Sequence, residues 1–109
     1  MSFKIRLMRE IEEDFQMERV EVFSGTISPG FVPLWEEAGV YESLYDSDGK
    51  KAREISRSLA YGLDRIVSDE GMATLIPPGT GGGVKEAVGF LESLLRACIV
   101  HPDARVEAS

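Results

Sequence analysis

A glycine-rich stretch ahead of a predicted helix is the part of the sequence most suggestive of ligand chemistry. Residues 79–83 read Gly-Thr-Gly-Gly-Gly, and an apolar helical repeat begins at Val84. Bare backbone N–H groups at a helix N-terminus favour anions, so Gly81, Gly82 and Gly83 are candidate contacts for a phosphorylated ligand. The stretch matches neither a P-loop, which needs Lys directly after its last glycine, nor the dinucleotide-binding fingerprint. A flexible loop between helices, or a mobile loop that contacts a partner, is the interpretation favoured over anion binding.

A basic cluster is the second candidate site. Lys50, Arg53 and Arg57 are spaced to lie along one side of a helix near its N-terminus. The helix dipole disfavours positive charge there, so something should compensate. Acidic residues of the protein between positions 36 and 42 are one source of compensation, and a bound phosphate or an acidic partner is the other.

Two aromatic residues are candidate contacts for a protein partner. Trp35 and Tyr41 belong to the residue types that anchor interfaces, although in a small domain they also complete the core. Apolar side chains in the segment 40–45 could additionally support a homodimer.

No constellation of side chains indicates catalysis or metal binding. Cys98 falls on the apolar stripe of the last predicted helix and is interpreted as a small core residue. His101 follows that helix, and no motif places a nucleophile or an acid beside it. A single cysteine and a single histidine do not assemble a zinc site. We therefore expect a protein that is not an enzyme and that uses no metal or cofactor.

The composition predicts a single folded domain over residues 1–109. Hydrophobic residues make up 43% of the chain and charged residues 28%, which is typical of a globular protein. The net charge of -7 disfavours direct binding to nucleic acids or anionic membranes, because their phosphates repel it. The sequence shows neither a signal peptide nor a window apolar enough to span a membrane. We expect a cytoplasmic protein.

Two strands are predicted near the N-terminus. Apolar residues alternate with polar ones over 3–11 and again over 19–27, which is the period of a strand with one face on a core. The acidic residues 12–14 lie between them and predict the turn of an antiparallel hairpin. Because a hairpin alone is marginally stable in water, we expect residues 104–108 to add a third strand beside the first.

Three longer helices are predicted between the hairpin and the final strand. Ser28 is expected to cap the first and Gly39 to end it. The predicted spans are 29–38, 50–67 and 84–99, with a short helical turn at 40–45 and coil or a single turn at 72–76. The predicted fold class is therefore α+β, in which an antiparallel β-hairpin plus the C-terminal strand forms a small sheet packed against three α-helices.

Three stretches of the sequence carry a resemblance to known proteins. They are Ala-Gly-Val-Tyr-Glu-Ser-Leu-Tyr at 38–45, the glycine-containing loop before the last helix, and Leu-Arg-Ala-Cys at 95–98 with His-Pro-Asp-Ala-Arg-Val at 101–106. In these stretches, and in the order of elements over residues 20–109, the chain resembles a family of small uncharacterised proteins encoded by tailed bacteriophages and prophages. The resemblance implies a phage or mobile-element origin and no established activity.

The chain departs from this family's pattern in two places. Thr-Gly-Gly-Gly at 80–83 stands where the family usually has an Asn-Gly-Trp-Gly type loop, and Ser28-Pro29 stands where a His-Asn type pair is usual. Both departures remove polar or aromatic groups that could bind a ligand.

Two functional hypotheses follow. The first is a small acidic phage or mobile-element accessory protein that acts in the host cytoplasm by binding a host protein, for example as an inhibitor of a defence system. The alternative is a protein that sequesters a small phosphorylated or nucleotide ligand. That ligand would lie between the glycines 81–83 and the basic side chains of Lys50, Arg53 and Arg57.

Overall fold

The sheet of this protein has three antiparallel strands in the order β2-β1-β3. In the computed structural model, which describes residues 3–109, β1 covers Phe3–Glu13, β2 covers Gln16–Ile27 and β3 covers Arg105–Ala108. Both β2 and β3 pair with β1, which confirms the predicted hairpin and the C-terminal strand. The turn of the hairpin lies at Asp14-Phe15, at the end of the predicted acidic turn.

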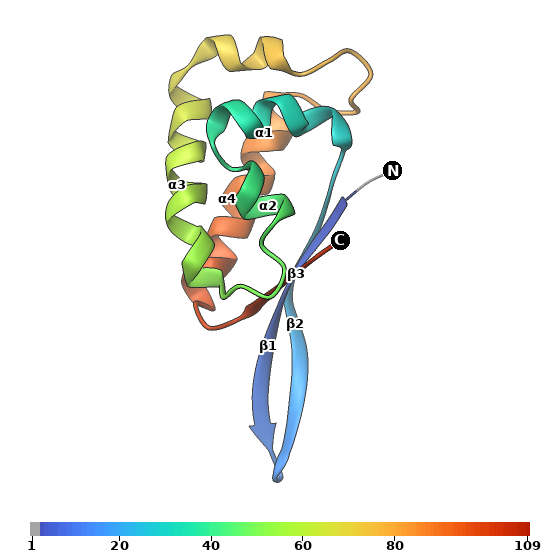
Figure 1. Ribbon diagram of the computed structural model, residues 1–109, viewed down its shortest axis with the longest axis vertical. Coiled ribbons are helices and arrows are strands. Elements are labelled where there is room, and N and C mark those ends of the chain that lie inside the picture. The colour runs from blue at the N-terminus through green and yellow to red at the C-terminus, as the bar shows by residue number, and fades with distance from the viewer. Residues whose placement is uncertain (1–2) are drawn as a thin grey trace.

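The third strand supports only the first half of the hairpin. β3 pairs with residues 5–8 of β1 and stops there. At the same point the pairing of β1 with β2 becomes irregular, because Leu7 lies opposite Phe23 while Met8 lies opposite Glu21. Val22 is thus the extra residue of a β-bulge, a feature that bends a strand and increases its twist. Beyond the bulge the hairpin extends away from the rest of the molecule (Figure 1).

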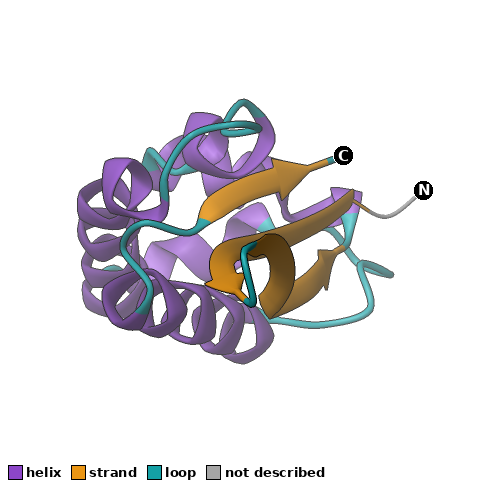
Figure 2. Ribbon diagram, turned by 90° about the horizontal axis from the view of Figure 1, so that it is seen from below, coloured by secondary structure: helices purple, strands orange, loops and turns teal. Residues whose placement is uncertain are grey.

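Helical segments connect β2 to β3 and gather on one side of the sheet (Figure 2). In chain order they are η1 (Pro29–Phe31), α1 (Val32–Ala38), α2 (Tyr41–Tyr45), α3 (Ala52–Ser68), η2 (Glu70–Leu75) and α4 (Val84–Val100). The three predicted longer helices correspond to α1, α3 and α4, and the predicted short turn corresponds to α2. The segment predicted as coil or a single turn lies mostly within the 3-10 helix η2.

Local signals in the sequence account for several of these boundaries. The Ser28 hydroxyl accepts a hydrogen bond from the Gly30 N–H at 3.3 Å, as expected of a helix cap. Gly39 ends α1 in the left-handed conformation, with φ of 80°, which glycine adopts without a Cβ clash. Gly62 lets α3 approach the α1–α2 connection, since a Cβ there would lie 2.1 Å from a methyl carbon of Val40.

One cluster of buried apolar side chains joins the sheet to the helices. Its members with the least exposed surface include Ile5 and Leu7 of β1, Trp35 of α1, Leu59 of α3, and Leu91 and Leu94 of α4. The apolar stripes predicted on the two long helices thus meet the apolar face of the hairpin's first half. Within residues 3–109, every helix is too short or too polar to cross a membrane.

Candidate functional site: the distal hairpin

The second half of the hairpin, residues 9–20, is the most unusual surface of the molecule, and we call it the distal hairpin. Every one of its residues is exposed except Ile11, which is partly buried. Neither a third strand nor the helical layer covers it, and it accounts for much of the 52 Å long axis of a molecule that is 27 and 20 Å across (Figure 1). The distal hairpin therefore contributes little to the core and presents both of its edges and faces to solvent.

The tip of the distal hairpin has a strained backbone. Asp14 and Phe15 form the two-residue turn between paired residues Glu13 and Gln16, and their φ angles are 52° and 66°. Two-residue hairpin turns with positive φ at both positions favour Asn-Gly or Asp-Gly, because glycine tolerates this conformation. A phenylalanine at the second position costs on the order of 1–2 kcal/mol. The tip thus combines a strained backbone with an exposed aromatic ring.

Apolar side chains on the distal hairpin are unusually exposed. Phe15 is 99% exposed, Met17 62% and Val20 40%. Burial of apolar surface contributes a free energy of about 25 cal/mol for each Å² removed from water. A ring left wholly in solvent can therefore contribute this free energy to the binding of a partner. Because exposed strand edges also invite unspecific pairing, the charges around these side chains are informative.

The charge of the distal hairpin is strongly negative near its tip. Between Arg9 and Arg19 the chain has no lysine or arginine. The same stretch contains five carboxylates, namely Glu10, Glu12, Glu13, Asp14 and Glu18. These charges keep the exposed strands soluble and repel other acidic surfaces.

Ion pairs tie the base of the distal hairpin to β3. Glu107 of β3 accepts from Arg19 and lies 3.0 Å from the Arg6 guanidinium, and Arg6 is also 3.9 Å from Glu21. Pairs this exposed contribute only about 0–1 kcal/mol each to stability. Their effect on charge is larger, because Arg19 is already used within the chain and does not offset the carboxylates near the tip.

The predicted anion site at the glycine loop is occupied by the protein's own carboxylate. Gly81, Gly82 and Gly83 do lead into the N-terminus of α4, as the sequence predicts. There the side chain of Glu86 accepts a hydrogen bond from the Gly83 N–H at 2.7 Å. This hydrogen bond, followed by one from its own backbone N–H, lowers the pKa of Glu86. A phosphorylated ligand would therefore have to displace a negative group already in place.

The predicted basic cluster does not converge on that loop. Lys50, Arg53 and Arg57 lie at the N-terminal end of α3, whereas the glycine loop lies beside the opposite end of this helix (Figure 1). A 17-residue helix is about 25 Å long, and most of this length lies between the basic cluster and the glycine loop. The Arg53 guanidinium lies 3.2 Å from the carboxylate of Asp103, so part of the compensation expected for these cations comes from within the chain.

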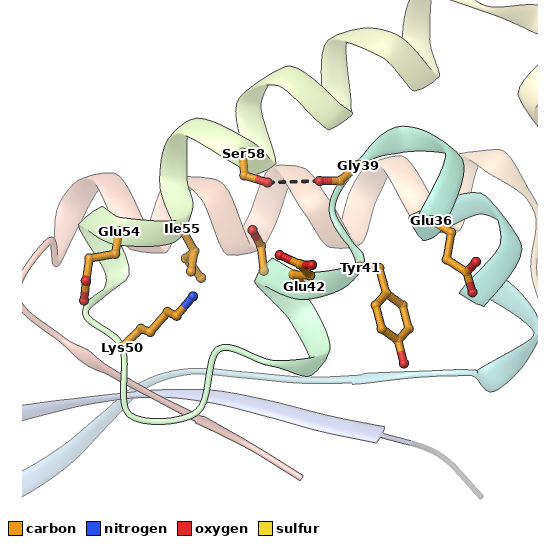
Figure 3. Close-up of a pocket in the computed structure, with 9 residues that line it drawn as sticks. Glu36, Gly39, Tyr41, Glu42, Lys50, Glu54, Ile55 and Ser58 are labelled. Atoms are coloured by element: carbon orange, nitrogen blue, oxygen red, sulfur yellow. Dashed lines mark hydrogen bonds between the residues drawn. The ribbon is translucent and has the colours of Figure 1, made fainter.

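Two of the predicted site residues share a surface hollow. Tyr41 and Lys50 line a hollow of about 470 Å³ between the α1–α2 segment and α3, where the Ser58 hydroxyl donates to the Gly39 carbonyl at 3.2 Å (Figure 3). The other charged residues of its lining are Glu36, Glu42 and Glu54. Three carboxylates against a single ammonium group make this hollow a poor receptor for a phosphate.

The predicted aromatic contacts are mostly core residues. Trp35 has no exposed surface, so its side chain cannot contact a partner of the folded protein. Tyr41 is half-buried and stacks on Tyr45 with ring centroids 4.8 Å apart, and Tyr45 stacks in turn on Phe3 at 4.3 Å. Burial and, to a smaller extent, the neighbouring Tyr41 raise the pKa of Tyr45. These stacked rings pack α2 against the start of β1.

The lone cysteine has the environment expected of a structural residue. Cys98 is 1% exposed and lies in the core cluster. Burial raises the pKa of its thiol to about 12, because the thiolate is poorly stabilised away from water. The reactive form is therefore scarce at neutral pH.

Reasoning from the sequence did not identify Phe15 and Met17 as site residues. Residues 15–18 were assigned to neither predicted strand, and an apolar residue beside a strand usually packs on a core. One signal could have pointed to them, since a lone phenylalanine follows Glu-Glu-Asp at a predicted turn. The decisive facts are tertiary, namely the early end of β3 and the bulge at Val22.

Comparisons with known proteins leave the chain without a match. A comparison with protein-family models, curated proteins and solved structures found no match.

Proposed function

We propose that this protein acts by binding another protein and that the distal hairpin is the surface that makes the contact. The observation that carries the proposal is Phe15, whose ring is 99% exposed and sits on a backbone with φ of 66°. Backbone strain at an exposed turn is a feature that recurs at functional sites. An aromatic side chain with few internal degrees of freedom is also an efficient interface anchor.

The chemistry of the distal hairpin defines the class of partner. An apolar pocket would receive Phe15, and the side chain of Met17 would adapt to its wall. Lysine and arginine residues around the pocket would face the carboxylates of residues 10–18 and accelerate association through long-range attraction. Surfaces of this kind occur on proteins that bind nucleic acids.

The biological setting of the proposal comes from the resemblance to phage-encoded proteins. On that basis the partner is a host protein, and occupation of its basic surface would inhibit it. Inhibition of a defence or nucleic-acid-handling protein is the form of this activity that we favour. The sequestration of a phosphorylated ligand gains no support. The basic side chains lie near the N-terminal end of α3, whereas the glycine loop lies beside its C-terminal end.

The proposal is tested by affinity capture from bacterial host lysate at physiological salt. We expect immobilised wild-type protein to retain a specific host protein and Phe15→Gly to lose it, because this variant removes the ring while relaxing the backbone. Phe15→Tyr is the matched control, since it keeps the aromatic surface and should retain binding. Capture should also weaken as salt is raised. Recovery of no specific protein, or equal recovery by Phe15→Gly, would contradict the proposal.

A further inference from the structure

A second apolar surface lies on the outside of the helical layer. Its residues belong to α3 and α4 and are distant in sequence from the distal hairpin. Two adjoining hollows of about 390 and 270 Å³ run along the groove between α3 and α4, and both are lined by Leu95 and Ile99. Tyr61 lines the first hollow, and Val100 lines the second. The exposed fractions of Tyr61, Ile99 and Val100 are 68%, 66% and 64%. We call this surface the outer helical face.

The outer helical face has no excess of negative charge, whereas the chain as a whole is acidic. The charged residues that line its hollows are Arg57, Glu92 and Arg96. Within residues 3–109, none of these three makes an ion pair. The net charge of -7 opposes association of two copies through most surfaces. The outer helical face lacks this excess of negative charge, because two arginines and one glutamate line its hollows.

The positions of two charges on α4 make this face complementary to itself. Glu92 and Arg96 are one helical turn apart and both line the second hollow. When two α4 helices cross in antiparallel orientation about a twofold axis between these residues, Arg96 of each copy lies opposite Glu92 of the other. A twofold interface repeats every such contact, so one chain supplies both members of two equivalent ion pairs.

We propose that the outer helical face binds a second copy of this chain and forms a twofold-symmetric dimer of helix pairs. The Glu92–Arg96 pairs would lie beside the twofold axis, and Leu95 and Ile99 of each copy would pack on either side of them. α3 and α4 each have 17 residues, which makes the face about 25 Å long and about 20 Å wide. Covering it on both copies buries on the order of 1,000 Å², which is the lower end of the range for specific interfaces.

This location differs from the one that the sequence suggests for a homodimer. Within the segment 40–45, Val40 and Leu44 have no exposed surface because they belong to the core. The proposed dimer also goes beyond partner binding by the distal hairpin, which lies outside the interface. Two hairpins on one dimer would let a partner with repeated sites bind more tightly than a single hairpin allows.

The experiment is a measurement of molar mass in solution for the full chain, by light scattering and sedimentation, from micromolar to near-millimolar concentration at physiological salt. We expect a concentration-dependent rise from the 12.0 kDa monomer towards twice that mass. Ile99→Glu should weaken dimerisation at least about tenfold, because it buries an unpaired charge in the apolar part of the interface. Met17→Glu is the matched control. It places the same charge at a similarly exposed position, 62% against 66%, but on the distal hairpin, and it should dimerise like the wild type.

Charge exchange on α4 tests the twofold geometry. Glu92→Arg and Arg96→Glu should each weaken the dimer by about threefold to tenfold, since each sets like charges opposite one another. The double variant Glu92→Arg/Arg96→Glu should restore it. Circular dichroism of each variant checks that the exposed substitutions leave the fold intact. A wild-type protein that stays monomeric throughout, a dimer indifferent to Ile99→Glu, or a double variant that is not restored would overturn the proposal. None of these results bears on capture by the distal hairpin.

Discussion

The two halves of the β1–β2 hairpin consist of the same two strands in opposite surroundings. In the first half, Ile5 and Leu7 have no exposed surface, and β3 and the helices enclose them. In the distal hairpin, Ile11 is the only residue that is even partly buried. A continuous pair of strands thus serves two purposes, because the bulge at Val22 and the end of β3 divide it. The first half stabilises the fold, and the distal half presents a surface.

The largest expected difference between the halves is in the cost of removing an apolar side chain. Leu7 and Ile11 are four residues apart on β1 and therefore point to the same side of the strand. Leu7→Ala should lower the free energy of unfolding by about 2–5 kcal/mol, since it leaves a cavity in the core. Ile11→Ala should cost under about 1 kcal/mol because little packs against it. Urea denaturation followed by circular dichroism measures both. Similar losses for the two variants would remove the distinction between the halves.

A smaller effect of opposite sign is expected at the tip. Phe15→Gly should raise the free energy of unfolding by about 0.5–1 kcal/mol, because glycine adopts the φ of 66° without strain. A stability gain combined with lost capture would show that the ring is kept for binding. The measurement is the same denaturation experiment, with Phe15→Ala as the control, since alanine removes the ring but keeps the Cβ. A loss of stability in Phe15→Gly would mean that the ring supports the fold.

The smallest effect concerns carboxylates, and it depends on pH. Glu86 belongs to the helical body and has a pKa below its ordinary value of 4.5. Its stabilising contribution is present above that ordinary value and is lost as the pH falls through the lower folded value. Glu86→Gln should therefore reduce the thermal midpoint at pH 7 and have no effect near pH 2. Glu12→Gln on the distal hairpin should leave the midpoint unchanged at both. A loss from Glu12→Gln equal to that from Glu86→Gln would contradict this difference.

Periodicity in the sequence was sufficient to predict the elements of the fold. The alternating runs over 3–11 and 19–27 and the apolar stripe of α4 depend on local spacing, and each needs a second layer to cover its apolar face. The C-terminal strand was predictable because a bare hairpin needs support. The end of β3 after four residues, which leaves half of the hairpin uncovered, depends on the path of the chain after α4. No local pattern encodes it.

The candidate site was less predictable than the fold for the same reason. Gly83 and Arg53 each stand at a helix N-terminus, but the sequence does not show that these two termini lie at opposite ends of an antiparallel helix pair. Nor does it show that Glu86 already fills the anion position. Trp35 has the residue type of an interface anchor and the position of a core residue. Phe15, by contrast, is identified by its exposure and its backbone angle.

Removal of the distal hairpin separates its role in binding from any role in folding. Residues 9–20 can be replaced by Asn-Gly, which would join the paired residues Met8 and Glu21 by a favourable two-residue turn. The thermal midpoint and the capture of a host protein are then measured on the same preparation. We expect a folded variant with a thermal midpoint close to that of the wild type and no captured partner. A variant that unfolds, or one that captures the partner as well as the full chain does, would contradict this expectation.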